Sequence, residues 1–188
     1  MLGDTLIGGQ LRDLRSVLTW LRTRDEIDAG RTALWGDSLA PVNTPDTNFA
    51  LPRDDDDALP PSPEPLGGLL ALLAGLYEEN ISAIYQRGGL VGFRSALASH
   101  LVLIPHDMIV PGVLTTGDLC DVVETLAPRP VRLEGMVDGL NRRVKDQTLP
   151  EVYRRAADAY RKRDAAGALT IRAEPMSAAA WFLAQFKH

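Results

Sequence analysis

Apolar side chains recur at every third or fourth position between residues 9 and 22, which is the spacing of one face of an amphipathic helix. The apolar positions are Leu11, Leu14, Val17, Leu18 and Leu21. Charged residues fall between them, so the pattern predicts a helix with one side on the core and the other side in water.

A second kind of pattern starts at residues 31–35, where a short apolar run ends at Gly36. Short apolar runs bounded by glycine predict strands that are buried in a sheet. Further strands are predicted over residues 81–86, 131–137 and 168–173, and they alternate with predicted helices over residues 66–79, 91–101, 119–126, 150–164 and 177–186. This alternation predicts an α/β fold, with a mostly parallel sheet and helices on both faces.

Only four strands are visible in this pattern, and the chain opens on a helix. We therefore expect the sheet to lack strands on its N-terminal side. An uncovered edge strand invites pairing with another chain. The edge at residues 31–35 is accordingly expected to be covered by a second copy in a homo-oligomer, by a missing N-terminal segment, or by the loop at residues 41–65.

Residues 41–65 interrupt the alternation. They contain seven prolines and the run Asp54–Asp57, a composition that predicts a long solvated loop inserted into the domain. Consecutive carboxylates lack the alternating spacing of a calcium-binding loop, so no metal site is predicted there. Residues 102–117 carry proline and glycine and are expected to be irregular, after which Asp118 is suited to cap the helix at 119–126.

Length and composition favour one ordinary globular domain over residues 1–188. The net charge is -5 and the basic residues are scattered, so nucleic acid is not an expected partner. Cys120 is the one cysteine, which excludes an internal disulfide and a multi-cysteine metal site. The longest apolar run, Leu66–Leu76, is too short to span a membrane. No signal peptide and no cofactor motif is evident, so a cytoplasmic protein without a cofactor is expected.

A candidate nucleophile lies directly after the first predicted strand. The segment Gly36-Asp37-Ser38-Leu39-Ala40 matches the serine turn G-x-S-x-G, with Ala40 in the place of the second glycine. A serine at that point would present its hydroxyl at the carboxyl end of the sheet, where open α/β sheets place their ligands. The alternative is a serine that caps the next element or fits a tight turn.

A serine nucleophile also needs an acid and a base, which follow in the order Ser, Asp or Glu, His in this kind of fold. Asp138 follows the predicted strand at 131–137 and suits the acid, although an Asx turn with the next residues is an alternative. The base is expected after the last strand, where residues 174–177 contain no histidine. The histidines are His100 and His106, which precede Asp138, and the terminal His188. The triad is incomplete by sequence order.

Four segments together resemble the acetyl-xylan-esterase and dienelactone-hydrolase-like group of α/β-hydrolases. They are the serine turn, the run Leu66-Gly-Gly-Leu-Leu-Ala-Leu-Leu73, the strand end Ile84-Tyr-Gln-Arg-Gly-Gly89, and Leu126-Ala-Pro-Arg-Pro130 before the strand that leads to Asp138. The resemblance covers the C-terminal part of that family's domain. It implies a serine carboxylic-ester hydrolase acting on a small ester, with Ser38 as nucleophile, the Leu39 N–H as oxyanion donor and Asp138 as acid. It supplies no base.

Two other interpretations compete with an active hydrolase of this group. Gly36-Asp37-Ser38-Leu39 is also the signature of GDSL esterases, but the D-x-x-H segment that those enzymes carry is absent. The missing histidine is equally compatible with a binding or structural module that descends from a hydrolase. The three tryptophans, Trp20, Trp35 and Trp181, are expected to pack in the core.

Overall fold

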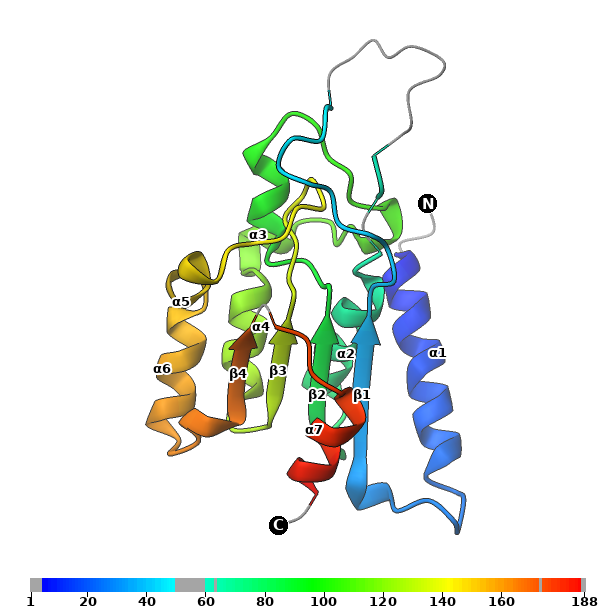
Figure 1. The fold of residues 1–188 in the computed structure, drawn as a ribbon. Helices are drawn as coiled ribbons and strands as arrows, with labels where there is room; N and C mark the ends of the chain where they lie inside the picture. The colour runs from blue at the N-terminus through cyan, green and yellow to red at the C-terminus, as the bar shows by residue number, and fades with distance from the viewer. Residues whose placement is uncertain (1–4, 50–59, 63, 173, 187–188) are drawn as a thin grey trace.

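A computed structural model describes residues 5–49, 60–62, 64–172 and 174–186 of the chain. Its centre is a parallel sheet of four strands, β1 (Thr32–Asp37), β2 (Ile81–Arg87), β3 (Val131–Glu134) and β4 (Leu169–Arg172). The strands lie side by side in chain order, each hydrogen-bonded to the next (Figure 1). The predicted α/β fold with a parallel sheet is confirmed.

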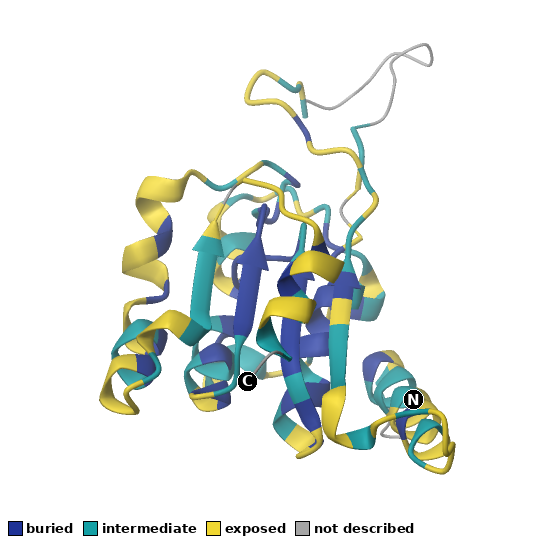
Figure 2. Ribbon diagram, turned by 60° about the horizontal axis from the view of Figure 1, so that its bottom comes forward, coloured by how far each residue is buried: buried dark blue, intermediate teal, exposed yellow. Residues whose placement is uncertain are grey.

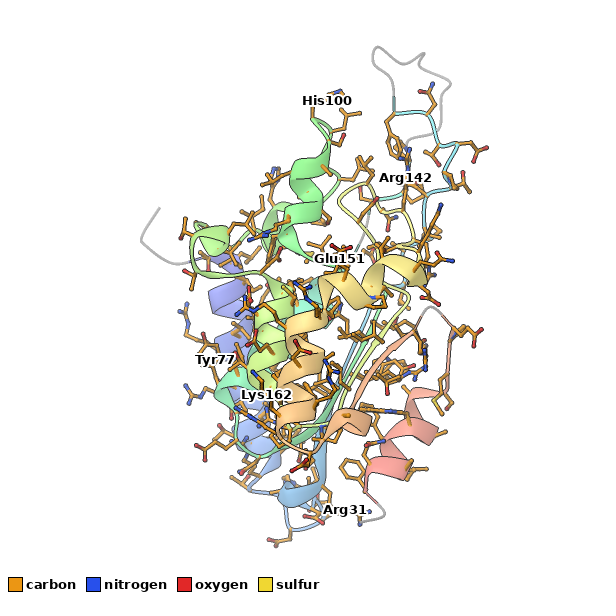
Figure 3. All side chains as sticks on the ribbon, turned by 90° about the vertical axis from the view of Figure 1, so that its left-hand side faces the viewer. Arg31, Tyr77, His100, Arg142, Glu151 and Lys162 are labelled. Carbon is orange, nitrogen blue, oxygen red and sulfur yellow. The ribbon has the colours of Figure 1, made fainter. Side chains whose placement is uncertain are left out.

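Helices cover both faces of this sheet. The α-helices are α1 (Leu6–Leu21), α2 (Leu66–Tyr77), α3 (Val113–Thr116), α4 (Leu119–Leu126), α5 (Leu149–Val152), α6 (Arg154–Lys162) and α7 (Ala178–Gln185). Helices α1, α2, α4 and α6 form a layer on one face, and α7 lies on the other (Figure 3). None of the described helices is long and apolar enough to cross a membrane.

The core lies between the sheet and the helix layer. Its largest cluster joins β2 and β3 to α2, α4 and α6, with fully buried residues such as Ile84, Val131 and Tyr160. Strands β2 and β3 are largely buried, whereas β1 and β4 are partly exposed (Figure 2). This difference follows from the topology, because β1 and β4 are the two edges of the sheet.

Three predicted elements have different bounds in the structure. Residues 91–101 do not form an α-helix; a 3₁₀ helix at Phe93–Ala98 takes their place. The strand predicted to reach residue 137 stops at Glu134, because Gly135 has a left-handed φ of 59°. The helix predicted over 150–164 is divided into α5 and α6 at Tyr153, whose backbone leaves the helical region.

Two of the three tryptophans are not in the core, contrary to the prediction. Trp20 is 58% exposed and Trp35 is 53% exposed, whereas Trp181 is buried. Trp20 lies on the solvent side of α1. Trp35 belongs to the edge strand β1, where only part of its indole contacts neighbouring groups, among them Tyr85 and the Arg87 guanidinium.

Candidate functional site

Ser38 directly follows β1 at the carboxyl end of the sheet, as predicted. Its backbone N–H donates to the Arg87 carbonyl at 3.0 Å, and its Oγ accepts the Glu64 N–H at 3.2 Å. Among the described non-glycine residues with positive φ, Ser38 does not appear, and the described residues between Ser38 and Leu66, where α2 begins, contain no helix. The serine therefore lies at a strand end without the immediate strand–turn–helix connection of a nucleophile elbow.

Glycines nevertheless bring β1 and α2 into very close contact at this point. A Cβ atom on Gly36 would lie 2.1 Å from the Gly67 carbonyl oxygen, and one on Gly67 would lie 3.1 Å from the Asp37 carbonyl oxygen. The glycine that packs against Gly36 is thus Gly67. It is not the second glycine position of the G-x-S-x-G pattern, which Ala40 occupies. The long loop is inserted between the strand and its helix, while the N-terminus of α2 stays beside Ser38.

A cavity of about 150 Å³ opens beside Ser38 at the carboxyl ends of β1, β2 and β3. Its lining comes from the long loop, from the ends of β2 and β3, and from the segments that follow β3 and β4. The lining residues are Ser38, Ala40, Val42, Arg87, Gly88, Glu134, Val137, Asn141, Arg143 and Pro175. No histidine is among them.

The buried Glu134 carboxylate forms the charged wall of this cavity. It accepts hydrogen bonds from Tyr85 Oη at 2.5 Å, Arg87 Nε at 2.8 Å and Arg132 Nε at 3.0 Å. Burial raises the pKa of Glu134, but the hydrogen bonds from Tyr85, Arg87 and Arg132 outweigh it, so the pKa is lowered overall. Burial and the bond to Glu134 raise the pKa of Tyr85. A carboxylate held this firmly ionised is a weak base for the Ser38 proton.

The predicted acid, Asp138, has a local role in the structure. Its Oδ1 accepts the backbone N–H groups of Leu140 and Arg142, both at 2.9 Å, which is the Asx-turn arrangement weighed as the alternative. Asp138 does not line the cavity that Ser38 lines. Leu39, whose backbone N–H is the predicted oxyanion donor, is 85% exposed.

The histidines do not complete a triad within the described chain. His106 is exposed in a short 3₁₀ helix, and His100 projects from the tip of the molecule (Figure 3). Neither lines the cavity. His188 and the four-aspartate run Asp54–Asp57 lie outside the described residues.

Two buried asparagines that sequence reasoning did not single out hold the described ends of the segment 41–65 beside the cavity. Asn43 Nδ2 donates to the Pro61 and Leu140 carbonyls at 2.9 Å each. Asn141 Nδ2 donates to the Pro41 and Pro61 carbonyls at 2.8 and 3.1 Å. The two arms of the loop are thereby tied to the segment after β3. The one signal in the sequence is the Asx-turn pattern that begins at Asp138.

Asn141 gives a first testable prediction, because it combines these bonds with a left-handed φ of 57°. Replacing Asn141 by alanine is expected to cost about 2–3 kcal/mol, since the buried amide is lost and alanine tolerates this φ poorly. Asn141→Gly should cost less, because glycine accepts the φ without strain. Urea unfolding followed by circular dichroism measures both. An equal loss of unfolding free energy in the two variants would show that the left-handed backbone conformation at residue 141 contributes nothing to the effect of Asn141→Ala.

Arg143 supplies a cation without a partner at the cavity. Among the described residues its guanidinium has no hydrogen bond and no ion pair, and it lies across Gly135, where a Cβ atom would approach Nη1 to 1.8 Å. Arg87, by contrast, is bonded to Glu134, Tyr85 and the Met176 carbonyl. The lining of the cavity therefore includes a positive charge without a partner among the described residues, and the Ser38 hydroxyl, whose own hydrogen is not used by the bond from Glu64.

Comparisons with known proteins add information on the fold. No family model and no curated protein matches the chain. A solved structure of a Bacteroides fragilis NCTC 9343 protein, named for a proposed acetyl xylan esterase activity, superposes with a TM-score of 0.57 at 16% identity. The match covers 89% of this chain and 36% of that one.

The chain has an α/β-hydrolase-like fold. At 16% identity the match extends to the fold alone. The chain spans little more than a third of the matched protein, so that protein's activity is not transferred by the match.

Proposed function

We propose that the chain is a serine-hydrolase-type domain, a carboxylic-ester hydrolase by descent, with Ser38 in the nucleophile position. The observation that carries the proposal is the placement of the Ser38 hydroxyl at the carboxyl end of β1, at a cavity and beside the α2 N-terminus that Gly36 and Gly67 hold close. Ligands of open α/β sheets bind at this edge. A small ester fits the size of the cavity.

In this proposal Ser38 Oγ attacks the acyl carbon of the ester, and the Leu39 N–H helps to stabilise the oxyanion. The bond to the alcohol then breaks, the alcohol leaves with the proton that the base took from Ser38, and water hydrolyses the acyl-serine. Asp138 orients the base that accepts the serine proton. That base is a histidine from outside the described residues or from another polypeptide. Loss of one triad member commonly lowers the rate by roughly 10⁴ to 10⁶, so the described residues alone are expected to hydrolyse esters very slowly.

A fluorophosphonate probe tests the nucleophile directly. We expect mass spectrometry to find a single phosphonyl adduct on Ser38, and no adduct on the Ser38→Ala variant. Ser82→Ala is the matched control, because the Ser82 hydroxyl is engaged with the Gly30 carbonyl at 2.8 Å and lies away from the cavity. Absence of a Ser38 adduct at millimolar probe, in protein with an intact circular dichroism spectrum, would refute a Ser38 nucleophile that this chain activates with its own residues.

A specific observation favours a second function, the binding of a small anion without catalysis. The unpaired Arg143 and the free Ser38 hydrogen are both suited to a carboxylate. Titration with sodium acetate should then shift the backbone amide NMR signals of Ser38, Gly88 and Asn141, and Arg143→Gln should weaken the effect. Acetate binding together with a negative fluorophosphonate result would favour this function over hydrolysis.

A further inference from the structure

The Ser38 hydroxyl accepts a hydrogen bond from a residue that is far away in the sequence. The donor is the Glu64 backbone N–H, 3.2 Å from Ser38 Oγ and 26 positions further along the chain. Prolines occupy positions 61, 63 and 65, and proline has no backbone N–H. The Glu64 amide is therefore the last backbone donor before α2 begins at Leu66, and it points at the candidate nucleophile.

The chain just before Glu64 is anchored by two buried side chains. The Pro61 carbonyl accepts Asn43 Nδ2 at 2.9 Å and Asn141 Nδ2 at 3.1 Å. Both asparagines are almost fully buried, so the two bonds are shielded from competing water. The position of the Glu64 amide is thereby fixed from its N-terminal side.

The chain just after Glu64 is anchored by α2. The Pro65 carbonyl accepts the Leu69 N–H at 3.1 Å, which makes Pro65 part of the first helical turn. That turn lies directly against β1, where Gly36 and Gly67 leave no room for a side chain between the two backbones. A backbone donor that is fixed from both directions needs little reorganisation when negative charge develops beside it.

The proposed hydrolase site has one backbone donor so far, the N–H of Leu39. In serine hydrolases of this fold the N–H of the residue after the nucleophile acts together with a second N–H, which comes from a different loop. The Glu64 N–H meets both conditions for the second donor. It comes from a separate segment of the chain, and it lies within hydrogen-bond distance of Ser38 Oγ.

We infer that the Glu64 N–H is the second oxyanion donor of this site. The inference rests on the proposed nucleophile role of Ser38 and adds a catalytic group to it. When Ser38 Oγ bonds to the acyl carbon, the base takes the serine proton and an electron pair of the carbonyl bond moves onto the carbonyl oxygen. That oxygen is two bonds from Oγ, so a donor that reaches Oγ reaches it after a small shift. The negative oxygen is also the stronger acceptor of the two.

The variant Glu64→Pro tests the inference, because it removes the N–H. Glu64→Ala is the matched control, since it removes the same side chain and keeps the N–H. All three proteins are treated with the fluorophosphonate probe, with imidazole added as the base. Oγ then bonds to phosphorus, fluoride leaves, imidazole takes the proton, and the phosphonyl oxygen occupies the oxyanion position. We expect labelling of Ser38 to be about 100-fold slower in Glu64→Pro and within about twofold of the wild type in Glu64→Ala.

A measurement on the wild type does not depend on the folding of the proline variant. Phosphonylation of Ser38 should move the Glu64 amide proton signal downfield in the NMR spectrum, because the N–H gains the phosphonyl oxygen as a stronger acceptor. The Gly30 amide is the internal control. It donates to Asp28 Oδ1 at 2.9 Å, at the other end of β1, and its signal should not move.

The possible failures of the inference and of the proposed function give different results. Equal labelling rates in the wild type and Glu64→Pro would overturn the inference and leave the Ser38 nucleophile in place. An equal fall in Glu64→Ala would assign the effect to the carboxylate side chain and would also overturn it. If Glu64→Pro lacks a native circular dichroism spectrum, the Glu64 amide signal decides, and an unmoved signal overturns the inference. A wild type that forms no Ser38 adduct even with imidazole would overturn the proposed function and the inference together.

Discussion

Replacing Gly36 by alanine is expected to cause the largest loss of stability that a single methyl group can produce in this chain. The added Cβ would lie 2.1 Å from the Gly67 carbonyl oxygen and 2.4 Å from the Gly68 nitrogen. Both are backbone atoms, so no side-chain rotation can relieve the overlap, and β1 and α2 must separate. Overpacking of a core costs about 1–3 kcal/mol and more when the backbone has to move. We expect a loss of about 3 kcal/mol or more.

Urea unfolding monitored by circular dichroism measures this loss, with Gly167→Ala as the matched control. A Cβ on Gly167 would meet nothing within 4 Å, so that variant should stay within about 0.5 kcal/mol of the wild type. The Gly36→Ala protein should also lose the hydrogen bond between Glu64 N–H and Ser38 Oγ, which NMR can follow at the Glu64 amide. Equal stability of the two variants would mean that β1 and α2 separate without cost.

The four strands were predictable because each is a short apolar run with glycine, proline or charge at its ends. The helix at 119–126 was predictable for a similar local reason: the Asp118 side chain accepts the Leu119 N–H, and the Asp118 N–H donates to the Asp121 carboxylate, which completes a capping box. Local signals of this kind need no knowledge of the rest of the fold.

Residues 91–101 show where local signals are insufficient. Their apolar spacing is helical, but the Asp118 carboxylate accepts the N–H groups of Phe93 and Arg94 at 2.6 and 3.1 Å, and the Tyr153 hydroxyl donates to the Val91 carbonyl at 2.9 Å. These bonds come from residues that are far away in the sequence, and they hold residues 91–101 in a conformation other than the predicted α-helix. The exposure of Trp35 was missed for a related reason, because an apolar strand pattern does not reveal which strand is the edge.

The candidate site also has a part that local sequence signals predict and a part that they do not. The position of Ser38 at the carboxyl end of β1 followed from the strand and the glycine after it. The pairing of Gly36 with Gly67 did not, because the long loop separates the two glycines in the sequence. The Glu134 network, too, draws Tyr85, Arg87 and Arg132 from two adjacent strands, and only the register of β2 with β3 brings them together.

Replacing Glu134 by alanine is the second substitution expected to have a large effect. The carboxylate is buried and is the shared acceptor of Arg87, Arg132 and Tyr85. Without it the Arg132 guanidinium, only 8% exposed, has no counter-charge at that point. Removing one partner of a buried ion pair typically costs about 3–5 kcal/mol, and we expect a loss in that range. Glu26→Ala is the control, because both side chains of its ion pair with Arg24 are exposed and the pair should contribute less than about 1 kcal/mol.

The pH dependence of unfolding distinguishes a charge effect from a simple loss of packing at Glu134. The folded-state pKa of Glu134 lies below its ordinary value of 4.5, because its hydrogen bonds outweigh the effect of burial. The network therefore stabilises the fold fully above pH 4.5, and this contribution is lost as the pH falls through the lowered pKa. Glu134→Gln keeps the shape but cannot ionise, so the stability difference between wild type and variant should shrink on acidification. A difference that stays constant from pH 7 to pH 3 would assign the effect to packing and would contradict a role for the charge.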